Sequence, residues 1–486
     1  MYSSSISDNF AFFSSLIFLT TALLLLLLLL IYDLQFNLIN LLIWSIGTYT
    51  ALSIIIYQIT NRKCFTLLTF FCLLFCFEIS VGYLISIYPH SLLIHSQLDS
   101  RLVTITLLVS TAAFFLCLLG YKLGSILLVM LIPLFKNKRH MGVFQFYLFP
   151  SRYRRILLGI AYAILCLKVE KIVRKVEVAG DFSSFMNTLM HWRFGTFAET
   201  YTENAVVVLI GILATPFVAF CCLGFYMIIQ RSLSTLERLA WTGLIIAGFV
   251  ISATSLFRSV LFTFLLAMVG TYDLLRPLAY RRIIQVGFVL VVALVFYNFL
   301  HYYLFHITGI WERLTFSQSI QFLLAPQGHF STLGEILATE LSGKAHLLGK
   351  GWLESVFFFV PRFVWTSKMS DYGLLAQTWA GLPDWYQQAP TNTGELVAHW
   401  GWLGILGTIV YGFYFCTFDK LKDFSPELSI GVIALVLPRV LVDVGMGFPA
   451  VCITLFSFVE FCILIRISKW FAGIRLPRGR YASHVN

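Results

Sequence analysis

The chain has 486 residues, of which 59% are hydrophobic and only 12% are charged. Soluble globular domains average about 25% charged residues, so this composition excludes a soluble protein. The net charge of +11 does not indicate a nucleic-acid partner, because the basic residues flank hydrophobic segments, as they do in membrane proteins. The composition therefore predicts an all-α, polytopic integral membrane protein whose residues 1–486 form a single membrane domain.

Hydrophobic segments of roughly 20 residues predict about twelve transmembrane helices. The first segment, 10–31, has no ionisable residue, and no Lys or Arg precedes Arg62. We therefore expect a retained first helix rather than a cleaved signal peptide. The segment at 102–121 could extend as a helix to residue 135, and 240–256 with 258–274 could form one broken helix pair. The other spans are expected at 38–59, 65–87, 102–121, 156–172, 205–229, 240–256, 258–274, 283–304, 394–418, 428–443 and 449–466.

The basic residues predict how these spans are oriented. Most of them lie in alternate connections, and the positive-inside rule makes that side of the membrane cytoplasmic. An even number of spans then places both termini in the cytoplasm, and the loops 173–204 and 305–393 on the outer face. The basic residues of the cytoplasmic side are Arg62, Lys63, the cluster from Lys136 to Arg155, Arg231, Arg238, Arg276, Arg281, Arg282, Lys420, Lys422, Arg466, Lys469, Arg475, Arg478 and Arg480.

Motifs for metals, nucleotides and redox chemistry are missing from the sequence. The 10 cysteines lie in or beside predicted spans, and none forms a CxxC motif with a matching His or Cys cluster. We therefore expect neither a zinc site nor a disulfide framework. The chain also lacks a Walker P-loop, a Rossmann fingerprint and a DxD-like motif, which argues against ATP-driven transport and a nucleotide-sugar donor. No metal or cofactor is expected.

Charged residues at predicted membrane depth are costly and usually face the bundle interior or a wet cavity. Arg258 lies at the outer turn between two spans, where it could clamp an anion or extend to the lipid headgroups. Arg439 and Asp443 are four residues apart, so they share a helix face. They could form a structural ion pair between helices, or the aspartate could orient an arginine that faces a ligand.

The loop 305–393 is too rich in apolar residues for a solvated linker, and a structureless loop of this length would be unusual. Its segments 333–341 and 352–364 have the pattern of short amphipathic or interfacial helices. We expect the loop to fold back over the outer mouth of the bundle.

The loop segment 357–368 places Arg362, Trp365 and Lys368 at intervals of three residues after Pro361. In a helix these side chains would fall near one face. Guanidinium binds phosphate in a bidentate manner, so two cations beside an aromatic ring suit an anionic glycolipid. The alternative is a re-entrant helix that its Trp and Lys anchor at the headgroups.

Glu395 and His399 open the tenth predicted span and lie four residues apart on one helix face. A carboxylate and an imidazole at the junction of loop and span could divide acid–base work. The alternative is structural, because the helix dipole alone favours a carboxylate near a helix start and a histidine there can serve as a packed side chain.

The order of these features resembles that of the Wzy-type oligosaccharide repeat-unit polymerases, which include the O-antigen and enterobacterial common antigen polymerases. The shared features begin with a large late loop, an Arg after a small polar stretch, a Pro-Arg-x-x-Trp-x-x-Lys motif and an Arg-x10-Gly spacing. They continue with a Gly-Glu pair that opens the next span, a Gly-x-x-Gly segment downstream of it, and an Arg in the penultimate span. In this chain they are Thr254–Arg258, Pro361–Lys368, Arg362 with Gly373, Gly394–Glu395, Gly401–Gly404 and Arg439.

The resemblance implies a GT-C-like helical fold in the cytoplasmic (inner) membrane of a bacterium, with the large loop and the active site facing the periplasm. It implies a glycosyltransferase that moves a growing glycan from undecaprenyl pyrophosphate onto the next lipid-linked repeat unit. The resemblance also implies that no metal and no nucleotide sugar take part. The expected partners are the lipid-linked donor and acceptor, membrane lipid and a chain-length regulator protein.

The resemblance also implies roles for the candidate residues. The leaving pyrophosphate needs its charge neutralised, and the acceptor hydroxyl needs a base, for which Glu395 is the first choice and Asp443 the second. His399 would orient the base or accept a proton. The residues expected to bind pyrophosphate and substrate are Arg258, Arg362, Trp365, Lys368 and Arg439.

Two other functions remain open. A flippase for lipid-linked oligosaccharide would tend to show two related halves, which this sequence lacks. The O-antigen ligases look similar but carry a loop histidine well before the Gly-x-x-Gly turn of the next span. Here Thr391 takes that place and His399 lies closer to Gly401, which favours a polymerase.

Overall fold

The structure is a computed structural model. It describes residues 38–61, 63–86, 99–131, 149–179, 213–230, 233–254, 258–276, 278, 282, 285, 329–349, 352, 356, 375–381, 391–438, 440 and 447–473. Every regular element within these ranges is a helix, and six stretches are long and apolar enough to cross a membrane. The prediction of a helical membrane protein is therefore confirmed, while the count of about twelve spans stays a prediction. The six stretches are Leu38–Thr60, Leu67–Leu84, Ser100–Met130, Thr235–Ser252, Asn392–Leu421 and Val451–Phe471.

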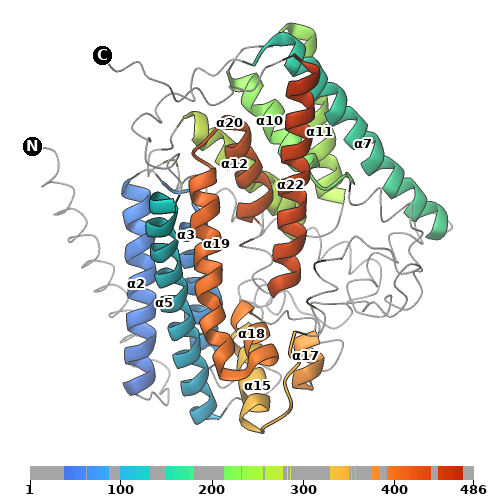
Figure 1. The fold of residues 1–486 in the computed structure, drawn as a ribbon. Helices are drawn as coiled ribbons and strands as arrows, with labels where there is room; N and C mark the ends of the chain where they lie inside the picture. Colours follow the sequence, from blue (N-terminus) through green and yellow to red (C-terminus); the bar gives the residue numbers. More distant parts are fainter. Residues whose placement is uncertain are drawn as a thin grey trace, which may run out of the picture.

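One group of helices runs side by side in Figure 1. Its members coincide with the spans expected at 38–59 and 65–87, and the helix expected at 102–121 extends ten residues beyond that range, to Leu131. The elements are α2 (Leu38–Thr60), α3 (Leu67–Leu74), η1 (Phe75–Val81), α4 (Gly82–Ser86), α5 (Ser100–Leu131) and α19 (Thr408–Leu421).

Small residues let α5 and α19 approach until their backbones touch. A Cβ atom added at Gly120 would lie 2.0 Å from the carbonyl oxygen of Ile409, and one at Gly412 would lie 1.9 Å from the carbonyl oxygen of Cys117. In a bilayer, where helix association depends on close packing, small residues at such spacing are a common basis of helix contact. This contact fixes α19 against α5 along much of its length.

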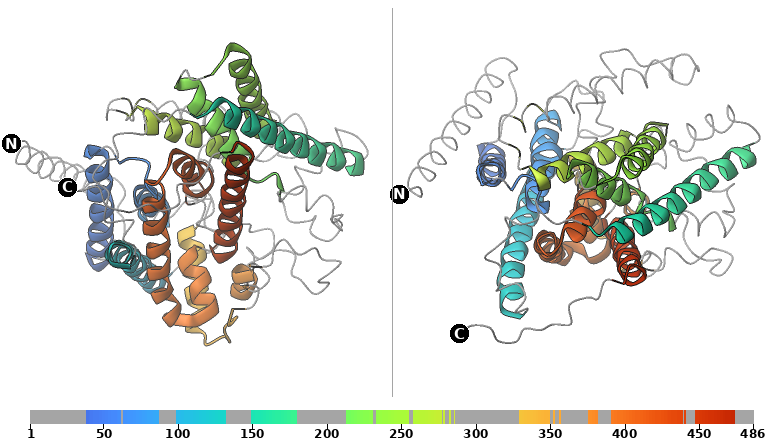
Figure 2. Two further views of the ribbon diagram at one scale, coloured as in Figure 1. Left: turned by 45° about the horizontal axis from the view of Figure 1, so that its top comes forward. Right: turned by 90° about the horizontal axis from the view of Figure 1, so that it is seen from above.

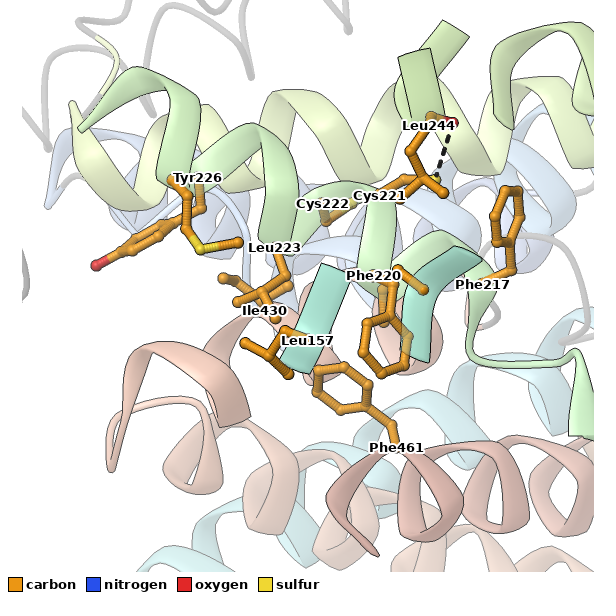
Figure 3. Close-up of a cluster of buried hydrophobic side chains, with 14 of the residues drawn as sticks. Leu157, Phe217, Phe220, Cys221, Cys222, Leu223, Tyr226, Leu244, Ile430 and Phe461 are labelled. Atoms are coloured by element: carbon orange, nitrogen blue, oxygen red, sulfur yellow. Dashed lines mark hydrogen bonds between the residues drawn. The ribbon is translucent and has the colours of Figure 1, made fainter. Parts of the chain in front are cut away.

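A second group packs around the cluster of buried hydrophobic side chains drawn in Figure 3. Phe220 and Phe461 meet edge to face at 5.5 Å between ring centroids, and the thiol of Cys221 donates to the carbonyl oxygen of Leu244. Seen from above in Figure 2, α7 reaches outward from this group. The elements are α7 (Ser151–Ala179), α10 (Phe217–Ile229), α11 (Thr235–Thr254), α12 (Arg258–Leu275), α20 (Pro426–Gly431), η4 (Val432–Val436) and α22 (Gly447–Phe471).

The end of the bundle where α19 and α22 finish lies toward the top of Figure 1, and charged side chains form ion pairs there. Glu237 accepts from Arg154 and Arg155 at 3.2 and 3.3 Å. Asp419 accepts from the backbone N–H of Leu67 at 2.8 Å and so caps α3. The positive-inside rule predicts that this end is cytoplasmic, which stays a prediction.

The described parts of the large loop lie at the opposite end (Figure 1). The helix expected at 333–341 is present within α15, and its residues Leu333 and Ile336 are fully buried. They share a core cluster with Val397 and Trp379, so this part of the loop is packed against the bundle. The elements are α15 (His329–Leu341), α17 (Leu375–Ala380), α18 (Asn392–Trp400) and η3 (Gly401–Gly407).

Candidate functional site

The site is built on α18, a short helix that opens the last part of the chain. Thr391 caps it, because the side-chain oxygen of Thr391 accepts from the backbone N–H of Gly394 at 3.1 Å. The helix ends at Gly401, whose φ of +60° lies in the left-handed region that glycine adopts readily. Glu395 and His399 lie between these two points and are 6% and 2% exposed. Both predicted polar residues therefore face the interior.

Two N–H donors hold the carboxylate of Glu395. The indole Nε1 of Trp352 donates to Oε1 at 3.2 Å, and the backbone N–H of Phe448 donates to Oε2 at 2.6 Å. Phe448 lies in the first turn of α22, where unpaired N–H groups and the helix dipole favour a negative charge. Among the residues that the structure describes, no Lys or Arg pairs with Glu395, so N–H dipoles alone stabilise its charge.

His399 uses one ring nitrogen to fix a turn of the loop. The backbone N–H of Gly349 donates to its Nδ1 at 3.0 Å, which leaves the proton of the neutral ring on Nε2. The carbonyl oxygen of His399 accepts a hydrogen bond from the backbone N–H of Leu348 at 3.1 Å. Leu348 and Gly349 both have positive φ, +48° and +77°. The histidine thus holds a turn whose backbone conformation is unusual for a non-glycine residue.

Trp352 connects these two polar residues, although the sequence did not single it out. Its backbone N–H donates to the carbonyl oxygen of Gly349 at 2.9 Å. The centroid of its ring lies 5.1 Å from that of the His399 ring. It also stacks on Phe448, with centroids 4.7 Å apart. His399 therefore positions the turn, the turn positions Trp352, and Trp352 binds Glu395. A tryptophan at the start of a predicted loop helix was the available signal.

A second polar pair flanks the end of α18. Nε2 of His346 lies 2.7 Å from Oε2 of Glu340. A Cβ atom added at Gly401 would lie 2.7 Å from Nε2 of His346 and 2.8 Å from Oε1 of Glu340. Only glycine therefore fits between this pair and α18. The contact ties the loop after α15 to the end of the helix that carries the site.

We expect Gly401→Ala to lower the melting temperature of the purified protein by several degrees, because it combines an unfavourable φ with a steric overlap; each such defect costs about 1–3 kcal/mol. Gly343→Ala is the matched control, because Gly343 also has a positive φ (+75°) but nothing lies within 4 Å of its added Cβ. Equal losses in the two variants would show that the overlap contributes nothing.

The other expected site residues cannot be placed beside Glu395. Arg258 is the first residue of α12, as the predicted start of a span at 258 requires, but its side chain is outside the described residues. The roles expected for Arg258 and for the other candidates stay predictions. The remaining candidates that lie outside the described residues are Arg362, Trp365, Lys368, Arg439 and Asp443.

Fold and site together define a helical membrane protein with a buried carboxylate at the end of the bundle opposite its basic end. Among the described residues, no group of three or more His, Cys, Asp and Glu side chains could hold a metal ion. Comparison with protein-family models, curated proteins and solved structures gives no match.

Proposed function

We propose that this chain is a Wzy-type polymerase, a glycosyltransferase that joins undecaprenyl-pyrophosphate-linked oligosaccharide units at the periplasmic face of a bacterial inner membrane. The proposal includes a GT-C-like fold of about twelve spans, with both termini in the cytoplasm and the loop 305–393 in the periplasm. A chain-length regulator is the proposed protein partner.

The buried carboxylate of Glu395 is the observation that carries this proposal. It lies at the junction of the large loop and a span, where a lipid-linked substrate would meet the bundle. Its two N–H contacts orient it and leave further lone pairs on both oxygens. No Lys or Arg of the described residues pairs with this carboxylate, so it can accept the proton of a sugar hydroxyl.

The proposed reaction is a single displacement at the anomeric carbon of the growing glycan. Glu395 takes the proton of the acceptor hydroxyl, and the hydroxyl oxygen forms the new bond to the anomeric carbon. The bond from that carbon to the pyrophosphate oxygen breaks, and undecaprenyl pyrophosphate leaves with the electron pair. Arg258, Arg362 and Arg439 are proposed to neutralise its charge, with Trp365 and Lys368 binding the substrate and Asp443 as the second choice of base.

His399 has a positioning role in this scheme. Its Nδ1 is occupied by the N–H of Gly349, so the atom that would accept a proton is already engaged. This contact supports the orienting role over the proton-accepting one. The histidine acts on Glu395 through the turn at Gly349 and through Trp352.

The test is the surface glycan of the source bacterium after deletion of the gene. We expect a single repeat unit on the terminal lipid, because units are still exported but no longer joined. Long chains that persist would overturn the proposal. Loss of all exported glycan would indicate a flippase, and long chains that stay on the carrier lipid would indicate a ligase.

A further inference from the structure

An open cavity of about 480 Å³ lies at the basic end of the bundle, far from the site on α18. It is formed where α7 begins and α22 ends, two helices that lie side by side at the top of Figure 1. Its volume falls within the range of small-molecule sites. The lining residues are Ser151, Arg152, Arg155, Ile156 and Phe471.

The charge around this cavity is positive. Arg154 and Arg155 share the single carboxylate of Glu237, and Arg155 uses only its Nε in that contact, so its terminal amino groups take no part in it. Arg152 is exposed. No carboxylate is among the described residues that line the cavity. The first turn of α7 adds N–H groups at the positive end of a helix dipole.

The depth of the cavity in the membrane follows from its aromatic rim. Phe471 lines it, and the adjacent Trp470 is 74% exposed at the end of an apolar helix. Exposed aromatic residues at the ends of spans mark the level of the headgroups. Ile156 and Phe471 add apolar surface beside the two arginines, so the cavity offers contacts to a phosphate and to the start of an acyl chain at once.

Neighbouring parts of the chain do not supply the anion. The segments 132–148 and 474–486, which precede and follow the described helices here, contain no Asp or Glu and together carry six Lys and Arg residues. Charge complementarity therefore favours an anion from outside the chain. At headgroup depth on the basic side of the membrane, the abundant anions are phospholipids.

We propose that this cavity binds the headgroup of an anionic phospholipid, with Arg152 and Arg155 on the phosphate and Ile156 and Phe471 against the adjoining chain. Because the positive-inside rule makes the basic side cytoplasmic, the lipid belongs to the cytoplasmic leaflet of the membrane. The site is separate from the polymerase proposal, and each can fail without the other.

The experiment is native mass spectrometry of the purified full-length chain with phosphatidylglycerol or phosphatidylcholine of the same acyl chains. The wild type should retain phosphatidylglycerol preferentially, and Arg152→Gln should bind it about fivefold more weakly, as expected for one basic residue near the surface. Arg238→Gln is the matched control, because Arg238 is exposed at the same end in α11 and does not line the cavity. Unchanged binding by Arg152→Gln, or an equal loss in Arg238→Gln, would overturn the site.

Inorganic phosphate distinguishes the lipid from a soluble ion. A lipid site should keep phosphatidylglycerol when inorganic phosphate is added in excess, because the acyl contacts remain. If phosphate alone displaces the lipid from the wild type and raises its melting temperature, but does not raise that of Arg152→Gln, the occupant is a soluble anion and the lipid assignment is wrong. Among the residues that the structure describes, none forms an ion pair or hydrogen bond with the side chain of Arg152. Comparison of melting temperatures without added anion checks that the variants fold.

Discussion

Glu395→Gln should abolish chain extension while the protein still inserts and accumulates. Removal of a general base costs about 10²–10⁴-fold in rate, which leaves single repeat units on the lipid. Glutamine keeps one oxygen acceptor for either Trp352 or Phe448, but its amide nitrogen cannot accept from the other donor. We therefore expect a stability loss of about 1–3 kcal/mol as well. The measurements are glycan length on gels and protein level in the membrane fraction.

Glu340→Gln is the control, because Glu340 is also a carboxylate at the same end and its side chain is only 7% exposed. It binds His346 and is not proposed to act on substrate, so its variant should still make long chains. Full-length glycan from Glu395→Gln would exclude the base role. Equal loss of extension in both variants, at equal protein levels, would mean that the end of the bundle needs its folded shape rather than this carboxylate.

The positions of the membrane helices follow from the sequence because of one physical constraint. A helix in a bilayer must satisfy all its backbone hydrogen bonds internally, so each span appears as an apolar run of the required length. The expected span 38–59 and the helix α2 at Leu38–Thr60 agree almost residue for residue. The expected span 156–172 lies within α7. This helix is not among the six described stretches that are long and apolar enough to cross a membrane.

The contacts between helices do not follow from the same constraint. The approach of α5 to α19 depends on Gly120 and Gly412, which lie far apart in the sequence. A glycine in an apolar run is compatible with a helix contact, a kink or open lipid. Their pairing is a property of the packed bundle, and hydropathy carries no information about it.

The candidate site was predicted in part for a related reason. Glu395 and His399 stand out because ionisable residues are rare in apolar surroundings, and both are buried in the structure. The shared helix face suggested that they act on each other, but each has its own partner, Trp352 and Gly349. Those partners come from the loop, whose path over α18 depends on tertiary packing that residue spacing does not encode.

The contact between α5 and α19 predicts a second large effect, on folding. Gly120→Ala should lower the melting temperature of the purified protein by several degrees or prevent its accumulation. The added Cβ would lie 2.0 Å from the carbonyl oxygen of Ile409, and a backbone atom cannot turn aside as a side chain can. The helices must separate, and overpacking of this kind costs about 1–3 kcal/mol or more. Thermal unfolding in detergent measures the loss.

Gly159→Ala in α7 should have the opposite sign. Nothing lies within 4 Å of its added Cβ, and alanine is favoured over glycine inside a helix by up to about 1 kcal/mol. A melting temperature for Gly120→Ala equal to or above that of Gly159→Ala would show that α5 and α19 do not touch. Because α19 continues directly from α18 and η3, its displacement would also move Glu395. Any Gly120→Ala protein that does accumulate should therefore extend glycan chains more slowly than Gly159→Ala.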